Sequence, residues 1–352
     1  MSKSLLNSIA ILEKIKSPLK IVDKIKVPKL LKNQLLIKIS YTAICGSQIF
    51  EIDGQRESKK YIPHALGHEA TGIVIEKGSN VKKLRKGDKV FISWIKSKGL
   101  ESKNKKIYYP NSKKKINYGK VATFLKFAIV PENRANKLPK KINLKNGVLL
   151  GCAIPSGAGM LLNQSKILKK SKILILGLGG VGISALMATK IFKDIYVYAY
   201  ELNSKTRNKI SKIYHKYKIL NQSEFSNLNK RIINSKEKGF DFIYDTTGSA
   251  KSISNALTLL NNNGKLIFAS HPKKNDKIKI EPFELIKGKK IEGSWGGLTN
   301  FEKNIKDYEK IILMNKKIIN KITHKLYTFK NINKAINDMR QKKSIRPVIK
   351  FI

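Results

Sequence analysis

The chain has 352 residues, of which 41% are apolar, and its mean hydropathy of −0.30 argues against a membrane protein. The 72 Lys and Arg residues outnumber the 24 Asp and Glu residues and give a formal net charge of +48. Nearly all of the basic residues are lysine, and they are spread through every region, which favours a compositional bias over a nucleic-acid-binding face. This length predicts two domains, and the lack of a credible signal peptide predicts a cytoplasmic protein. Because lysine is scattered and arginine is scarce, no specific nucleic-acid partner is expected.

The first 150 residues are rich in strand patterns. Residues 35–41 and 71–76 alternate in the way that half-buried strands do. Residues 86–89 contain a Gly-Asp turn that leads into a further strand over 90–92. We therefore expect a β-rich domain over residues 1–150.

The chain contains only two cysteines, Cys45 and Cys152, which excludes a disulfide scaffold in so long a protein. One histidine, His68, lies between them in a Gly-His-Glu segment. Two thiolates and one imidazole can hold zinc at three points and leave a fourth position open, as catalytic zinc sites do. Spacing alone does not decide between such a site and three buried core residues.

From residue 151 to residue 293, strands alternate with helical segments, which predicts an α/β fold with a parallel, doubly wound sheet. The strands are expected at 172–176, 195–200, 240–245 and 264–269. The first strand leads into a G-x-G-x-x-G loop and then into an apolar helix-forming segment. Glycines at this spacing allow a tight turn, the close approach of a pyrophosphate and close packing of helix on strand. The loop residues expected to bind a dinucleotide are Gly177, Gly179, Gly180, Val181 and Gly182.

Glu201 ends the second of these strands, 24 residues after Gly177. A carboxylate at this place bonds the ribose hydroxyls of a dinucleotide and repels a 2′-phosphate, which predicts NAD rather than NADP. Lys205 and Arg207 follow closely and offset part of that repulsion. The alternative interpretation is a solvated acid at the end of a strand.

The remaining residues, 294–352, return to a mixed pattern. They predict a helix over 303–315, a strand over 322–327 and a second helix over 331–341. The last ten residues include the segment Ser-Ile-Arg346-Pro-Val-Ile-Lys.

Taken together, these segments resemble the zinc-dependent medium-chain alcohol dehydrogenase family over nearly the whole chain. The resemblance rests on C-G-S-Q at 45–48, G-H-E at 67–69, Cys152 placed 25 residues before Gly177, and the segments 288–297 and 323–350. It implies a GroES-like β-rich catalytic domain over 1–150, completed by 294–352, and a Rossmann NAD-binding domain over 151–293. We also expect a homodimer or a homotetramer.

The resemblance further implies roles for single residues. The residues that would bind one catalytic zinc ion are Cys45, His68 and Cys152. Glu69 would lie behind the metal, and Ser47 would accept the proton of an alcohol that gives its hydride to NAD. Arg346 would contact the pyrophosphate of the cofactor. The implied reaction converts an alcohol into an aldehyde or a ketone.

Three features depart from the family pattern. Region 95–120, where many relatives bind a second, structural zinc ion, holds no cysteine, so one zinc ion per chain is expected. Gln48 stands where relatives commonly carry an aspartate that hydrogen-bonds the metal-binding histidine; it can accept that bond but supplies no charge. Phe50 stands where some relatives continue a proton relay with a histidine, so here the proton is expected to pass directly to water.

Two other functions stay open. A zinc-free reductase of the same superfamily would keep the glycine loop and lack the ligands, and a non-enzymatic nucleic-acid-binding protein would tolerate loss of the site. Trp94 and Trp295 occupy positions that resemble pocket walls, which suggests a bulky or ring-shaped alcohol such as a polyol or a sugar. As mere packing residues, the two tryptophans would carry no such information.

Overall fold

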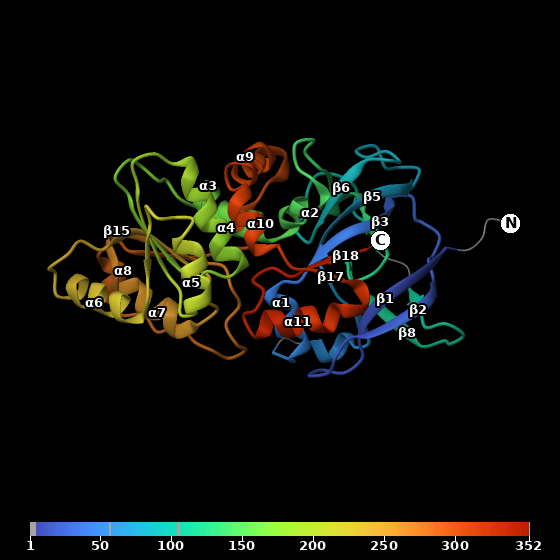
Figure 1. Ribbon diagram of the computed structural model, residues 1–352, viewed down its shortest axis with the longest axis horizontal. Coiled ribbons are helices and arrows are strands. Elements are labelled where there is room, and N and C mark those ends of the chain that lie inside the picture. The colour runs from blue at the N-terminus through green and yellow to red at the C-terminus, as the bar shows by residue number, and fades with distance from the viewer. Residues whose placement is uncertain (1–4, 56–57, 104–105, 352) are drawn as a thin grey trace. The chain divides into compact units, whose positions relative to one another are not determined.

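The computed structural model describes residues 5–55, 58–103 and 106–351. The chain forms two compact units, whose elements are labelled in Figure 1. Unit 1 contains the residues up to Cys152, the segment Asn300–Ile305 and the residues from Ile319 on. Unit 2 contains Ala153–Thr299 and Lys306–Ile318.

This division differs from the predicted boundaries in the C-terminal region. Residues 294–299 and Lys306–Ile318 belong to unit 2, although all of 294–352 was expected to complete the first domain. The reason is packing inside unit 2, where the Tyr308 hydroxyl lies 2.6 Å from Thr299 Oγ1. In the same unit the Tyr214 hydroxyl donates to the side-chain oxygen of Asn315 at 2.7 Å.

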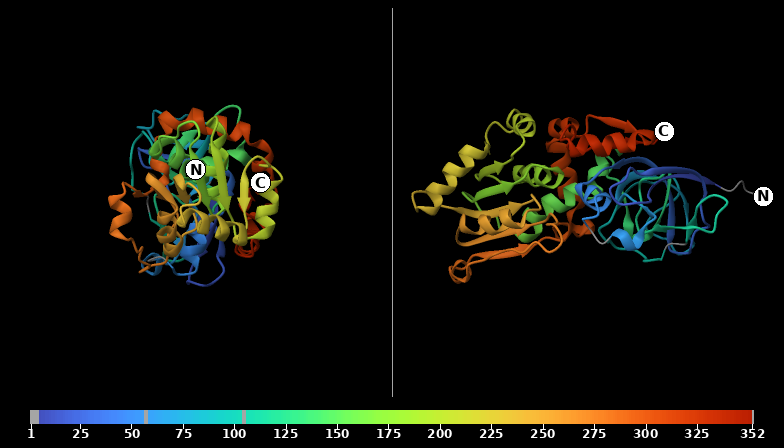
Figure 2. Two further views of the ribbon diagram at one scale, coloured as in Figure 1. Left: turned by 90° about the vertical axis from the view of Figure 1, so that its left-hand side faces the viewer. Right: turned by 90° about the horizontal axis from the view of Figure 1, so that it is seen from below.

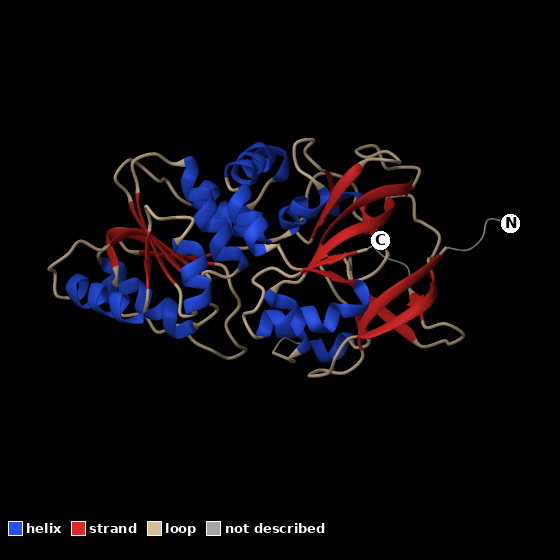
Figure 3. Cartoon of the chain, in the orientation of Figure 1, coloured by secondary structure: helices blue, strands red, loops and turns tan. Residues whose placement is uncertain are grey.

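Unit 1 is built on two β-sheets, drawn as red arrows in Figure 3. Its strands are β1 (Leu6–Leu12), β2 (Lys20–Lys26), β3 (Gln34–Ala43), β4 (His64–Ala65), β5 (Glu69–Lys77), β6 (Lys89–Ser93), β7 (Ile107–Tyr108), β8 (Lys115–Tyr118), β9 (Phe127–Pro131), β10 (Ala135–Lys137), β17 (Leu326–Thr328) and β18 (Val348–Lys350). One sheet has the order β2-β1-β4-β8-β7, and the other has the order β10-β6-β5-β3-β18-β17, with β9 also paired to β3.

The alternating pattern of the sequence explains how these strands pack. On β3 the side chains of Leu35, Ile37 and Ile39 are buried in a core that also contains Val74 of β5 and Val90 of β6. Because successive side chains of a strand point to opposite faces, one face of each strand supplies this core. The strands predicted at 35–41, 71–76 and 90–92 therefore form as expected.

Short helices and the C-terminal residues complete unit 1. Its helical elements are α1 (Gly46–Ile52), η1 (Ser58–Tyr61), η2 (Glu132–Arg134), α2 (Leu144–Gly147), η3 (Val148–Gly151), η6 (Phe329–Asn331) and α11 (Ile332–Arg340). Strand β18, red in Figure 1, lies beside the blue strand β3. The two strands pair antiparallel, with Val348 opposite Ala43. The Ile44 N–H donates to the Pro347 carbonyl at 3.0 Å. This pairing brings Arg346 next to Cys45.

The predicted strand over 322–327 is wrong in its first half. Helix α10 (Lys316–Ile322) extends to Ile322, and β17 begins only at Leu326. The side chains of Ile318, Ile319 and Ile322 are buried. Their spacing of i, i+1 and i+4 places them on one face of a helix, whereas in a strand neighbouring side chains point to opposite faces. The two predicted helices are found as α9 (Phe301–Met314) and α11.

Unit 2 is a doubly wound sheet of six parallel strands, as predicted. Its order is β13 (Lys218–Leu220), β12 (Tyr196–Tyr200), β11 (Lys172–Leu176), β14 (Phe240–Asp245), β15 (Leu260–Phe268) and β16 (Lys290–Gly293). Helices cover both faces of the sheet (Figure 2). They are α3 (Ala153–Gln164), α4 (Gly180–Ala188), η4 (Thr189–Ile191), α5 (Ser204–Ser211), α6 (Gln222–Ile233), α7 (Ala250–Thr258), α8 (Pro282–Ile286) and η5 (Gly296–Leu298). Within the described residues, no helix has both the length and the apolar character needed to cross a membrane.

The buried carboxylate of Glu132 holds the start of region 95–120, which contains no cysteine, against residues 82 and 83. Glu132 in η2 is 3% exposed, and its Oε1 accepts the N–H groups of Lys82 at 2.8 Å and Lys83 at 2.7 Å. Its Oε2 accepts the N–H of Leu100 at 2.9 Å. Burial raises the pKa of Glu132, but these backbone hydrogen bonds outweigh it and hold the pKa below its ordinary value.

We expect Glu132→Gln to destabilise the protein by about 1–3 kcal/mol, because the amide presents N–H groups where backbone donors need an acceptor. The difference from wild type should stay constant above about pH 5 and shrink as the pH falls through the lowered pKa of Glu132, where the carboxylate becomes protonated. Chemical unfolding at several pH values measures this difference. Glu76→Gln, at an exposed acid of β5, is the control. Equal stability of the two variants at pH 7 would contradict the anchoring role.

Candidate functional site

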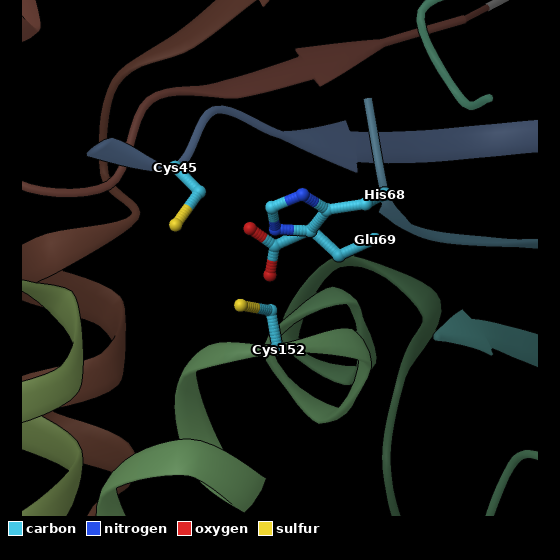
Figure 4. A group of neighbouring side chains, drawn as sticks. All are labelled: Cys45, His68, Glu69 and Cys152. Carbon is cyan, nitrogen blue, oxygen red and sulfur yellow. The ribbon is translucent and has the colours of Figure 1, made fainter. Parts of the chain in front are cut away.

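Four side chains of unit 1 converge on one point. The sulfur atoms of Cys45 and Cys152, a ring nitrogen of His68 and a carboxylate oxygen of Glu69 all lie within 4.8 Å of one another. Figure 4 shows the four groups turned toward a common centre. Both cysteines and Glu69 are buried, and His68 is half-buried. The structure thus brings together the three predicted metal ligands and the predicted Glu69.

Each of these residues sits at the end of an element. Cys45 is the N-cap residue of α1, His68 lies between β4 and β5, and Glu69 begins β5. Cys152 directly follows η3, which packs tightly on β5: a Cβ atom on Gly151 would lie 2.6 Å from Cβ of Glu69. Only glycine permits this close approach, which places Cys152 against the start of β5.

Two buried polar atoms of the cluster make no hydrogen bond. They are Nε2 of His68 and Oε2 of Glu69. An unpaired buried nitrogen is costly unless a ligand satisfies it. Two thiols and an imidazole are the donors that zinc prefers, and a carboxylate is a further possible ligand. The residues present therefore fit a zinc ion.

The pKa values of the two thiols are shifted in opposite directions. A hydrogen bond from the Cys152 thiol, helped by His68 and Arg346, holds the pKa of Cys45 well below its ordinary value, although burial opposes this. The same bond and burial raise the pKa of Cys152 well above its ordinary value. Because zinc binds thiolates, the raised pKa of Cys152 opposes metal binding, and a Cys152 thiol has to release its proton when a metal binds.

Arg346 makes a contact that the sequence did not indicate. Its guanidinium donates to Oε1 of Glu69, and the two side chains are 1% and 0% exposed. Burial raises the pKa of Glu69 to about 7, and the nearby Arg346 charge works in the opposite direction. The predicted contact of Arg346 with a pyrophosphate remains a prediction. No local signal reveals the ion pair, because its partners lie 277 residues apart.

Helix α1 carries two more predicted residues. The Ser47 hydroxyl is buried and has no hydrogen-bond partner, which leaves it free to bond a substrate. Gln48 is 2% exposed, and its side-chain oxygen accepts the Cys45 N–H at 2.8 Å. Its amide nitrogen faces Nδ1 of His68. Trp94 lies edge-on to the His68 ring, with the ring centres 6.5 Å apart.

The glycine loop of unit 2 follows β11 and opens α4. Gly177 has a φ of +82°, a conformation that favours glycine, and a Cβ on Gly182 would lie 1.9 Å from the Gly177 carbonyl oxygen. Gly179 is the N-cap residue, and Gly180 and Val181 begin the helix. The first N–H groups of a helix lack intrahelical partners and, with the helix dipole, form a natural site for phosphate.

Glu201 lies beside this loop. Its Oε2 accepts the N–H of Leu178 at 2.8 Å, and its Oε1 accepts the N–H of Asn203 at 2.8 Å. Arg207 donates to the backbone carbonyls of Glu201 and Leu202, at 2.8 and 2.9 Å. The carboxylate that was predicted to select the cofactor is therefore held against the glycine loop. Trp295, also in unit 2, is 69% exposed and lies edge-on to His271.

Comparisons with known proteins agree with this arrangement. Residues 31–140 match the model of the alcohol dehydrogenase GroES-like domain, and residues 180–312 match that of the zinc-binding dehydrogenases. S-(hydroxymethyl)glutathione dehydrogenase of Saccharomyces cerevisiae is 26% identical over 95% of the chain and 94% of its own length. Alcohol dehydrogenase class-3 of Drosophila melanogaster is 24% identical over 96% of the chain and 95% of its own length. The crystal structure of benzyl alcohol dehydrogenase from Acinetobacter calcoaceticus superposes with a TM-score of 0.87 at 22% identity, covering 99% of this chain and all of that one.

Proposed function

Because the chain belongs to the zinc-type medium-chain dehydrogenases and is an alcohol dehydrogenase, we propose that it oxidises an alcohol with NAD at one zinc ion held by Cys45, His68 and Cys152. The observation that carries this proposal is the buried, unbonded Nε2 of His68 beside two thiols. A bound zinc ion would supply Lewis acidity at the alcohol oxygen, and NAD would supply the hydride acceptor.

The chain's own residues have separate tasks in this reaction. The unbonded Ser47 hydroxyl accepts the proton of the alcohol and passes it on to water, because the phenyl ring of Phe50 cannot relay it. Glu69 and Arg346 supply a neutral, buried ion pair beside the ligands. In unit 2, the glycine loop and Glu201 orient the dinucleotide.

Metal analysis together with a substrate panel tests the proposal. The purified full chain should contain one zinc ion, since region 95–120 lacks cysteine, and should reduce NAD with one or more members of a panel of alcohols. Reduced nicotinamide is followed by its absorbance, with NADP run in parallel. No zinc in an active enzyme would favour the zinc-free reductase, and two zinc ions per chain would contradict the single site.

The substrate class is proposed from Trp94. Its ring stands edge-on to the ligand His68, so a flat or cyclic substrate portion can pack against it. We propose a bulky or ring-shaped alcohol, such as a polyol or a sugar, and the panel therefore includes cyclic, aromatic and polyhydroxy members. Higher kcat/KM for short linear alcohols than for all of these would overturn this choice.

We expect Glu201→Ala to weaken NAD binding and to reduce the preference for NAD over NADP by about 10²-fold, given ~1.4 kcal/mol per tenfold. The change removes a charge that repels a 2′-phosphate and also frees the Leu178 N–H from its acceptor. The ratio of kcat/KM for the two cofactors is the measurement. Glu281→Ala, at an exposed acid of the same unit, should leave the ratio unchanged. A wild-type enzyme that prefers NADP would remove this role from Glu201.

The assembly, the compartment and the binding partners are also proposals. We propose a homodimer or a homotetramer in the cytoplasm, and sedimentation of the purified protein measures its size. The charge of +48 should give only weak, salt-sensitive binding to nucleic acid. A sequence-specific complex that survives physiological salt would contradict the small-molecule assignment.

A further inference from the structure

The side-chain amide of Gln48 lies between two groups of the metal-binding cluster. At one end, its oxygen accepts the backbone N–H of Cys45 at 2.8 Å, as in a helix capping box. At the other end, its nitrogen faces Nδ1 of His68. Gln48 is 2% exposed, so water has little access to either contact.

Metal binding changes what His68 requires from this amide. Nε2 of His68 is the ring nitrogen that is buried without a partner. If Nε2 binds a metal, a neutral imidazole carries its proton on Nδ1, and this N–H needs an acceptor. A glutamine amide has a single oxygen, and here the oxygen already serves Cys45. The amide hydrogens would then point at the N–H of His68.

Turning the amide over does not remove the conflict. The oxygen would then accept from His68 Nδ1, and the amide hydrogens would face the buried N–H of Cys45. In either orientation, one N–H next to a metal ligand stays without an acceptor, which costs free energy in the metal-bound state. In the metal-free state the Gln48 amide satisfies both neighbours, because Nδ1 can accept from Gln48 while the proton moves to Nε2, the nitrogen that a metal would otherwise occupy.

We propose that Gln48 is a positioning residue that favours the metal-free tautomer of His68 and thereby weakens zinc binding and eases zinc exchange. This inference rests on the proposed metal centre. A carboxylate of the same length has two acceptor oxygens and no hydrogens. Glutamate at this position therefore serves the N–H groups of Cys45 and His68 at once.

Zinc affinity tests the proposal without any assay of activity. The full metal-free chain and its Gln48→Glu variant compete for zinc with a chromophoric chelator. We expect the variant to bind zinc 10- to 100-fold more tightly, the range by which outer partners of metal ligands change affinity. Gln55→Glu adds the same charge at an exposed position of unit 1 and should leave the affinity unchanged. Equal affinities of wild type and Gln48→Glu would overturn the inference, whereas a wild type that binds no zinc would instead overturn the proposed function.

The tautomer of His68 separates this hydrogen-bond role from a simple charge effect. In metal-free protein labelled with ¹⁵N-histidine, the five histidines give distinct ring signals, and His68→Asn identifies that of His68. The wild type should carry the His68 proton on Nε2, and Gln48→Glu should carry one on Nδ1. A wild-type His68 already protonated on Nδ1 in the metal-free state would refute the proposal, even if the variant bound zinc more tightly.

Discussion

Serine in place of Cys152 is expected to lower kcat/KM for alcohol oxidation by about 10³-fold, because losing Lewis-acid stabilisation costs several kcal/mol at 1.36 kcal/mol per tenfold. A serine hydroxyl is a poor zinc ligand at neutral pH, so the metal would be left with Cys45 and His68. The fold should persist, since Cys152 sits at the end of η3 and the sheets of unit 1 pack without it.

Three measurements on Cys152→Ser decide this prediction. Zinc content should fall together with activity, and circular dichroism should stay the same as for wild type. Cys152→Asp, which offers a carboxylate ligand, should recover part of the zinc content. Full zinc content and full activity in the serine variant would show that Cys152 is not a ligand.

The second large effect is expected for Arg346→Gln, which should destabilise the metal-free protein by about 3–5 kcal/mol. The substitution leaves Glu69 buried with no cation, and removing one partner of a buried ion pair costs far more than the pair is worth. Chemical unfolding without cofactor and without metal is the measurement. Because no cofactor is present in that experiment, the loss of stability would come from the ion pair with Glu69 and not from a contact with pyrophosphate.

Arg340→Gln is the matched control for this prediction. Arg340 also pairs with a carboxylate, that of Asp53, but the two side chains are 34% and 33% exposed. An exposed pair contributes about 0–1 kcal/mol, so this variant should unfold nearly as wild type does. If Arg346→Gln is equally stable and only binds NAD more weakly, then the contact with pyrophosphate is its whole role.

Local patterns allowed much of unit 2 to be predicted from the sequence. Strand β11 and the glycine loop are contiguous, so one short stretch carries the apolar run, the turn and the helix start. Strands β13 and β16 were not predicted, because they lie at the two edges of the sheet and are only three and four residues long. Edge strands need fewer apolar residues, which weakens their signal.

The proposed metal centre illustrates the opposite case. Spacing did not distinguish Cys45, His68 and Cys152 from core residues, and the resemblance to a family selected them. The pairing of Arg346 with Glu69 was not predicted at all, because it depends on β18 lying next to β3. The orientation of the Gln48 amide was equally hidden, since it is fixed by a backbone donor and a ring nitrogen that come together only in the folded chain.

The divided composition of unit 1 sets the order in which a newly made chain completes its parts. Domains usually fold from the N-terminus onward while the ribosome adds roughly 5–20 residues per second. Here unit 2 has all its residues once Ile318 has been made, but strand β18, which pairs with β3, and Arg346, which pairs with Glu69, are made only afterwards. Unit 1, which contains the first half of the chain, is therefore the last to have all its residues. A product of interrupted translation that stops before Arg346 would contain every residue of unit 2, but it would lack strand β18 and the cation that pairs with Glu69.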